Sequence, residues 1–317
     1  MRKVILILAR IIVGGALLLL MFFMGAAFFY AQRADYGWKP VIAQPSFTTE
    51  HPRVVFDEGH NNASKAGFSG RYWPFARLLR ADGYSLERAN FTFAPESLAD
   101  VRILVIVNAS GAPKPQMFGI NLPIPTRLRR GDPAFTEPEV RALHEWVEQG
   151  GSLLLIADHA PSGEAAFALG KSLGVTMHNG FVEIPGERSD PMMFSAENGR
   201  LGQHPIITGD GPGTMVSRVA TFTGQSLDGP PGATVLLRLP EGAVESVPDA
   251  DDRFTEQPAG PAQGVAFEPG RGRVVVLGEA AMMTAQVSGR VPFGLNTGDN
   301  DNQQLVLNIM RWLARKL

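Results

Sequence analysis

Polar side chains that can bind metal ions or move protons follow three apolar, strand-like runs in this sequence. The runs cover residues 54–56, 153–157 and 274–278. Because the carboxyl ends of parallel strands open onto one crevice of an α/β sheet, we expect these distant side chains to converge in a single site. The residues concerned are Asp57, Glu58, His60, Asn61, Asp158, His159 and Glu279.

These residue types suit hydrolytic chemistry. Imidazoles such as His60 and His159 titrate near neutral pH, and a carboxylate such as Glu279 can be tuned by burial. The sequence contains no His-Glu-x-x-His spacing, so a metal site would need ligands from several loops. We therefore expect no resident cofactor, and a divalent metal only if the protein is a hydrolase. The structural alternative is that Asp158 caps a helix while His60 and Asn61 hold a loop together.

Three weaker motifs accompany these residues. The segment 67–71 opens a helix, where backbone N–H groups supported by Arg71 can hold an anion or simply form a turn. Ser162 stands at a strand-to-helix turn but lacks the first glycine of the hydrolase nucleophile pattern. The acidic segment 299–302 lacks the glycine and glutamate of a calcium loop, so we expect it to cap the last helix. Asn302 is also a candidate ligand-binding residue.

Apolar runs and segments of helical period alternate along the chain, which predicts βαβ units and a mostly parallel sheet. The run 101–107 is too continuous for a half-exposed edge strand, so we expect it in the centre. Thr136 and Glu139 have capping-box spacing and predict a helix that ends at Gly150. The predicted strands are 53–56, 84–86, 101–107, 152–157 and 273–278, and the predicted helices are 72–81, 136–149, 162–173 and one after 299–302.

Two long segments are less regular. The segment 109–135 is rich in proline and glycine, and a loop of this length is more often functional than accidental, so we expect it to cover the site. From about 175 to 263 short apolar runs alternate with glycine, proline and acidic residues, which predicts an irregular, β-containing insertion. The first segment carries three arginines that could stabilise an anion, namely Arg127, Arg129 and Arg130.

The stretch 11–30 is apolar or small throughout. As a helix it would measure about 30 Å, which matches the hydrocarbon layer of a membrane. Positive residues precede it, which predicts a single pass through the cytoplasmic membrane, a cytoplasmic amino terminus and an extracytoplasmic (periplasmic) domain. A cleaved signal peptide is the alternative. The predicted divisions are an anchor 1–31, a linker 32–51 and a domain 52–317.

The composition excludes several classes of protein. With 317 residues, 44% of them hydrophobic, the chain can bury a full core. Its formal net charge of −2 and the lack of a basic stripe argue against nucleic-acid binding. The sequence has no cysteine, which rules out disulfides, thiolate metal sites and a cysteine nucleophile.

Three segments together resemble the class I glutamine amidotransferase-like superfamily, and more narrowly an uncharacterised, membrane-anchored branch built on a domain of unknown function. They are 55–61, 150–159 and 301–313. The resemblance covers about 53–313, with a poorly matched middle third, and implies a flavodoxin-like, doubly wound, mostly parallel sheet. Enzymes of this superfamily carry a cysteine after the strand that here ends at Ala157, where Asp158 and His159 stand instead. Glutaminase chemistry through a thiol is therefore excluded.

Two hypotheses follow for the strand-end site. The favoured one is a binding domain for a small polar ligand or an envelope partner, tethered to the bilayer through residues 11–30. The alternative is a hydrolase, metal-dependent or based on histidine and aspartate. The candidate catalytic residues are His159, Asp158, His60 and Glu279, and the candidate ligand-binding residues are Asp57, Glu58, Asn61, Arg71 and Asn302.

Overall fold

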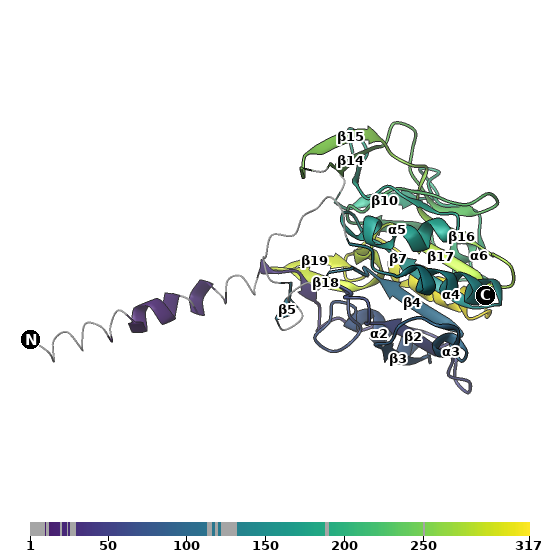
Figure 1. The fold of residues 1–317 in the computed structure, drawn as a ribbon, viewed down its shortest axis with the longest axis horizontal. Helices are drawn as coiled ribbons and strands as arrows, with labels where there is room; N and C mark the ends of the chain where they lie inside the picture. The colour runs from purple at the N-terminus through teal and green to yellow at the C-terminus, as the bar shows by residue number, and fades with distance from the viewer. Residues whose placement is uncertain are drawn as a thin grey trace, which may run out of the picture.

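The computed structural model describes residues 10, 13–19, 21–23, 25, 30–112, 116–117, 120–121, 132–187, 190–249 and 251–317. Its centre is a sheet with five parallel strands among the described residues (Figure 1). In chain order these strands are β2 (Arg53–Asp57), β3 (Ser85–Ala89), β4 (Ile103–Val107), β7 (Ser152–Ile156) and β17 (Arg273–Leu277). They lie in the order β3-β2-β4-β7-β17. Counted along the chain this is second, first, third, fourth, fifth, which is the flavodoxin-like arrangement.

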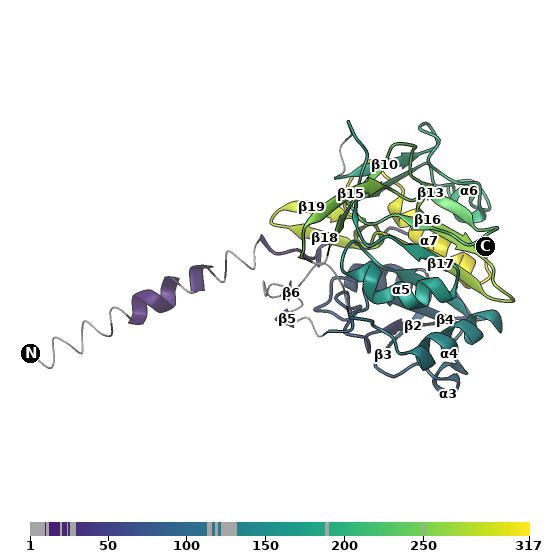
Figure 2. The same cartoon turned by 45° about the horizontal axis from the view of Figure 1, so that its top comes forward.

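Helices cover both faces of the sheet, as Figures 1 and 2 show. Val54 and Phe56 of β2 pack with α2 (Trp73–Ala81) and α7 (Asn302–Leu313) on one face, called here the α2/α7 face. Val55 points the other way and packs in a second cluster with α3 (Pro95–Leu98), α4 (Glu137–Glu148) and α5 (Ser162–Ser172). Because side chains alternate along a strand, residues buried on both faces explain the continuous apolar runs in the sequence.

The helix signals in the sequence are partly confirmed. Helix α4 begins with the predicted capping box of Thr136 and Glu139, and Gly150, with φ of 120°, follows its end. The expected capping of the last helix is partly confirmed, because the side chain of Asn300 accepts a hydrogen bond from the backbone N–H of Asn302 at 3.0 Å. Asp301, the N-cap residue, makes no side-chain cap at α7. Its carboxylate instead accepts hydrogen bonds from the backbone N–H groups of Ser217 (2.7 Å) and Arg218 (3.0 Å), which joins the helix to a distant strand.

The region predicted as an irregular insertion is only partly separate from the main sheet. Strand β16 (Ala262–Phe267) forms a hairpin with β17, and three strands of the region extend the sheet beyond β16. They are β8 (Thr176–Met177), β12 (Leu227–Asp228) and β13 (Thr234–Arg238). Other strands form small sheets, namely β10 (Met192–Ser195) with β11 (Arg218–Thr221), and β9 (Phe181–Glu183) with β14 (Val244–Pro248) and β15 (Phe254–Pro258). The remaining short elements are β5 (Gln116–Met117), β6 (Ile120–Asn121), α6 (Pro205–Thr208) and η1 (Ala281–Met283).

The amino-terminal residues 13–19 and 21–23 are helical, and Figure 1 shows them apart from the domain. No helix within the described residues is both long enough and apolar enough to cross a membrane. The span predicted for 11–30 includes positions outside the described residues and stays a prediction. Beyond it, β1 (Arg33–Ala34) pairs with β18 (Ala285–Ser288), which pairs with β19 (Val291–Gly294). Part of the segment 32–51, predicted as a linker, therefore lies against the domain.

Candidate functional site at the carboxyl edge of the sheet

The loops that carry the candidate residues leave the same edge of the sheet. The strands β2, β4, β7 and β17 are parallel and adjacent in register, so their carboxyl ends meet at one edge, called here the carboxyl edge. The structure then divides the candidates between the two faces. Because side chains two positions apart on a strand share a face, Asp57 lies on the same side as Val55, toward α4. Glu279 instead lies beside Tyr72 and Met282 of the α2/α7 face. Two polar clusters result.

The first cluster is centred on His60, which bridges two carboxylates. Its Nδ1 lies 2.9 Å from Oδ1 of Asp57, and its Nε2 lies 2.9 Å from Oε1 of Glu139 on α4. The imidazole is buried and stacks on Phe93 with ring centroids 4.5 Å apart. Asn62 donates to the other oxygen of Asp57 at 3.0 Å. Both ring nitrogens of His60 are thus occupied, and this arrangement ties the loop after β2 to α4.

The two carboxylates control the protonation of this histidine. Burial alone would lower the pKa of His60, but the hydrogen bonds and charges of Asp57 and Glu139 outweigh it and raise the pKa above its usual value. The pKa of Glu139 moves down, because hydrogen bonds from His60 and Thr136 outweigh the effect of burial. The two carboxylates thus favour the charged imidazolium form of His60, and His60 in turn favours the ionised form of Glu139.

The second cluster contains Glu279, Asp158, Arg71 and Tyr72. Glu279 is fully buried and accepts hydrogen bonds from the backbone N–H groups of Ala281 (2.6 Å) and Met282 (2.8 Å). Burial, together with the charge of Asp158, raises the pKa of Glu279 well above its usual value. A carboxyl group held neutral in this way can donate a hydrogen bond as well as accept one.

Arg71 supplies the positive charge of the second cluster. Its Nε is buried and has no hydrogen-bond partner, and its Nη1 donates to the side chain of Gln32 at 3.3 Å. Burial lowers the pKa of Arg71, and the charge of Asp158 partly restores it. Arg71 as a whole is half-buried, but leaving its buried Nε–H group without an acceptor costs free energy. An anionic or strongly polar ligand group beside Arg71 would offset that cost.

His159 differs from His60 in having a free ring nitrogen. Its Nδ1 lies 2.9 Å from the backbone oxygen of Ala160, and its ring stacks on Phe181 with centroids 4.4 Å apart. Because a carbonyl oxygen can only accept, Nδ1 must carry a proton, and in the neutral form of the imidazole Nε2 then has the lone pair. Within the described part of the chain, no hydrogen-bond partner occupies Nε2. His159 therefore has the tautomer that a general base or a metal ligand requires.

The other candidate residues have structural partners or face solvent. Glu58 accepts from the backbone N–H of Ala66 at 3.0 Å, and Asn61 is exposed with a positive φ of 48°. Asn302 is fully buried, and its amide bonds both backbone groups of Ala220 at 2.9 and 2.8 Å. Ser162 is buried in the first turn of α5. The loop arginines 127, 129 and 130 lie outside the described residues.

Sequence reasoning assigned Glu139 to the capping box but missed its contact with His60. Its Oε2 accepts from the backbone and hydroxyl of Thr136, and its Oε1 is left for His60 and for the backbone N–H of Phe93. The only signal in the sequence was that a capping carboxylate has a second oxygen. No pattern indicated that its partner would lie on the loop after the first central strand.

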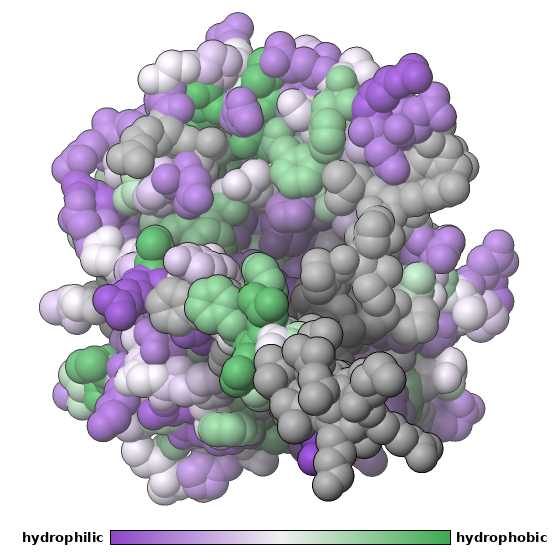
Figure 3. Space-filling model, turned by 90° about the vertical axis from the view of Figure 1, so that its left-hand side faces the viewer, coloured by the Kyte–Doolittle hydropathy of each residue, from purple (hydrophilic) through white to green (hydrophobic). Residues whose placement is uncertain are grey.

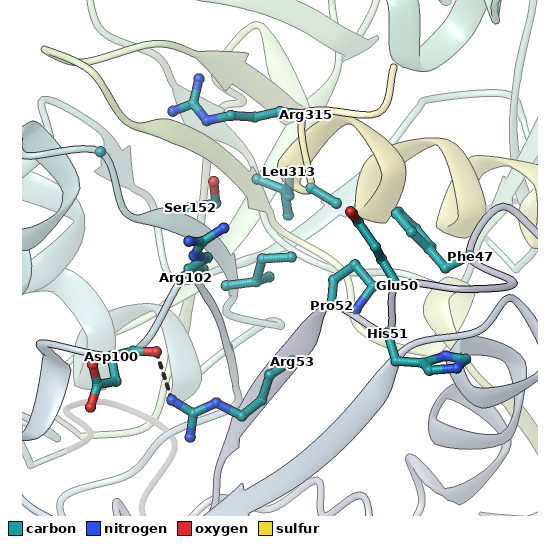
Figure 4. Close-up of a pocket in the computed structure, with 13 residues that line it drawn as sticks. Phe47, Glu50, His51, Pro52, Arg53, Asp100, Arg102, Ser152, Leu313 and Arg315 are labelled. Atoms are coloured by element: carbon teal, nitrogen blue, oxygen red, sulfur yellow. Dashed lines mark hydrogen bonds between the residues drawn. The ribbon is translucent and has the colours of Figure 1, made fainter.

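A cavity of about 630 Å³ lies at the opposite, amino edge of the sheet. Arg53, Ile103 and Ser152, which line it, are the first residues of β2, β4 and β7. Figure 4 shows Arg53 bonded to Asp100 there, with Arg102 reaching into the cavity. None of the candidate residues lines this cavity. We place the functional site at the carboxyl edge, because the crevice of an open α/β sheet forms beyond the carboxyl ends of its strands.

The carboxyl edge is hollowed and polar. Seen from this side, hydrophilic residues gather in a hollow near the middle of the face, with hydrophobic residues beside it (Figure 3). Among the described residues, no group of three or more histidine, aspartate and glutamate side chains is placed to hold a metal ion. Beside the His60 cluster, the loops of this edge carry the guanidinium of Arg71, the carboxyl of Glu279 with its raised pKa, and the imidazole of His159.

No family model matches this chain, and no curated protein matches it. Among solved structures it is similar to the mmIFT52 N-terminal domain, with 12% identity over 82% of this chain and 96% of that chain and a TM-score of 0.54. A protein from Bacteroides uniformis described as ThuA-like matches at 12% identity over 86% of this chain and 94% of its own, with a TM-score of 0.41.

A third match is a Thermoplasma acidophilum protein described as part of a GMP synthase, at 11% identity over 84% of this chain and 96% of its own, with a TM-score of 0.39. The ThuA-like and GMP synthase proteins belong to the glutamine amidotransferase-like class. At these identities the first similarity shows a shared fold alone, and the two lower scores add no argument about activity.

Proposed function

We propose that this protein is a membrane-anchored, extracytoplasmic binding domain with a glutamine amidotransferase-like fold. Its ligand is a small polar molecule or envelope component with an anionic group, held at the carboxyl edge by Arg71. Glu279, whose raised pKa favours the protonated form, flanks that group and donates a hydrogen bond to it, and Asp158 accepts hydrogen bonds from neutral polar groups of the ligand. Because the chain has no cysteine, the thiol chemistry of the amidotransferases has no part in this function.

The observation that carries the proposal is the incomplete set of partners around Arg71. Arg71 is half-buried; its Nε is buried without a partner and its Nη1 makes one long hydrogen bond, whereas a buried N–H group normally has an acceptor. A ligand phosphate or carboxylate would provide the missing acceptors. Burial and the charge of Asp158 raise the pKa of Glu279, which favours its neutral form and lessens its repulsion of that anion.

The anchor is supported by the apolar helix before β1. Described residues of this helix, including Leu18 and Phe22, expose 66% and 70% of their surface to solvent. Soluble proteins rarely expose apolar residues in such a contiguous series, and an exposed series of this kind marks a membrane or protein contact. With the positive residues that precede it, a single pass through the cytoplasmic membrane is the arrangement that we propose.

The binding proposal can be tested with inorganic phosphate and the full chain in detergent micelles. We expect phosphate to raise the thermal unfolding temperature of the wild type and to lose this effect in Arg71→Met. Arg102→Met, the matched change in the cavity of Figure 4, should respond as the wild type does. If only Arg102→Met lost the stabilisation by phosphate, the site would lie at the amino edge. If phosphate had the same effect on all three proteins, the binding proposal would be rejected.

The tautomer of His159 favours hydrolysis as a second candidate function. Its Nε2 could take a proton from water as the water attacks an ester or phosphate, and then return it to the leaving group. The test is a panel of nitrophenyl esters and phosphates, with metal analysis of the purified protein. Turnover that His159→Ala abolishes and His144→Ala retains would establish the enzyme. If none of these substrates is turned over, the binding domain remains the proposed function.

A further inference from the structure

The chain leaves the apolar amino-terminal helix and enters the domain almost at once. Tyr30 is the last helical residue, and only Ala31 and Gln32 separate it from β1. Two extended residues span about 7 Å. The hydroxyl of Ser288 on β18 also donates to the backbone oxygen of Tyr30 at 3.1 Å. The end of the helix is therefore held next to the β18–β19 hairpin, with no slack between them.

Exposed apolar side chains border the point where the helix joins the domain. Val291, at the tip of the hairpin, exposes 66% of its surface, and Phe68, in the loop before α2, exposes 69%. The ring of Phe68 packs on Tyr36, two residues after β1, with centroids 5.1 Å apart. Arg290 is exposed in the hairpin turn. Aromatic, aliphatic and arginine side chains in this mixture are typical of surfaces that sit in the headgroup layer of a bilayer.

The candidate site adjoins the same point. Gln32, the residue just before β1, accepts the hydrogen bond from Arg71. The hydroxyl of Thr284, next to β18, donates to the backbone oxygen of Arg71 at 2.9 Å. The segment that supplies the site arginine is thus fastened to the segment that follows the helix. The contacts with Gln32 and Thr284 therefore hold Arg71 close in space to the end of the helix.

We propose that the carboxyl edge of this domain rests on the surface of the bilayer, with Val291, Phe68 and Tyr36 in the headgroup layer. This inference rests on the anchor proposed above. The occupant of the surface is the lipid itself, because the apolar stretch 11–30, proposed above as the anchor, ends only three residues before β1 at this edge. The strand-end site consequently opens toward polar groups carried in the membrane plane, and the amino-edge cavity of Figure 4 faces away from it.

Because the sequence has no cysteine, a single introduced cysteine can be labelled selectively. Single cysteines at Val291→Cys and Phe68→Cys would be coupled to an environment-sensitive fluorophore in the full chain. The control is Arg271→Cys, an exposed position in the turn before the amino end of β17. Each protein would be reconstituted into phosphatidylcholine and phosphatidylglycerol vesicles with and without a quencher on the lipid headgroup.

We expect a blue shift and quenching at positions 291 and 68, and neither at 271. Vesicle flotation of the same samples reports the anchor separately. A chain that floats but shows no quenching at 291 or 68, or equal quenching at 271, would overturn the membrane-facing orientation while the anchor stands. A chain that does not float would reject both the anchor and this orientation. Thermal unfolding of each labelled protein confirms that the comparison is made between folded chains.

Discussion

Replacing His60 with alanine would test whether the first cluster is held together by charge. The change leaves Asp57 and Glu139, which expose 1% and 4% of their surface, without the imidazolium between them. Removing one partner of a buried ion pair typically costs about 3–5 kcal/mol. The lost stacking on Phe93 adds about 1 kcal/mol. Hydrogen bonds that the carboxylates keep with Asn62 and with backbone groups offset part of this sum, so we expect about 3–5 kcal/mol in total.

The effect of this change must depend on pH in a definite direction. The pKa of His60 is raised in the folded protein, so its contribution is complete below the unfolded value of about 6.5 and is lost as pH rises through the folded value. The pKa of Glu139 is lowered, so its contribution is complete above about 4.3 and is lost as pH falls. The cost of His60→Ala should therefore be greatest between roughly pH 4.5 and 6.5.

Urea denaturation of the full chain at pH 6 and pH 9 measures this cost. The control is His144→Ala on α4, a half-exposed side chain whose Nε2 lies 3.5 Å from the exposed Glu148, where we expect a loss below about 0.5 kcal/mol. A cost of less than about 1 kcal/mol for His60→Ala at pH 6 would contradict the charge-based account. So would a cost that increases from pH 6 to pH 9.

Three further changes probe other parts of the structure. Glu279→Gln should cost about 1 kcal/mol at pH 4, because an amide cannot accept both backbone hydrogen bonds. This cost should shrink as pH rises. The pKa of Glu279 is raised in the folded protein, so the wild type loses stability above about pH 4.3. Asp82→Asn should cost about 3–5 kcal/mol in urea denaturation, since the buried carboxylate binds Arg311 through two hydrogen bonds of 3.0 and 2.7 Å. Gly70→Ala should cost about 1–3 kcal/mol and weaken phosphate binding, because a Cβ would lie 2.0 Å from the backbone oxygen of Lys65.

Matched surface changes serve as controls for these three. Arg141→Ala removes an exposed pair with Glu137 at 3.8 Å, and Gly211→Ala adds a Cβ in open space. Both should stay within about 0.5 kcal/mol of the wild type. A cost for Glu279→Gln that grows with pH, or losses for the Asp82 and Gly70 variants no larger than those of the controls, would show that the contacts described above do not set stability.

The parallel core could be predicted from local patterns. Each central strand is a continuous apolar run because both faces of the sheet are covered, and this signal does not depend on distant residues. The same holds for Thr136 and Glu139, which lie one helical turn apart and satisfy each other locally. The edge at which the polar residues emerge followed from the parallel order of those strands.

The separation of those residues into two clusters could not be predicted in the same way. Whether Asp57 turns toward α4 and Glu279 toward the α2/α7 face depends on strand alternation and on loop paths after the strands end, which composition does not encode. Short strands raised the same difficulty, because β1 and β12 have two residues each. Two residues show no period, and their place is decided by partners far along the chain.

The pairing of β1 with β18 has a consequence for biosynthesis. Arg33 is the partner of Val287, which lies 254 positions later in the chain. At about 5–20 residues per second, a ribosome needs on the order of ten seconds to a minute to make that length. Strand β1 must therefore wait until the ribosome has made β18 before its hydrogen bonds can form. The closing of the β18–β19 hairpin onto β1 therefore follows the synthesis of all five central parallel strands.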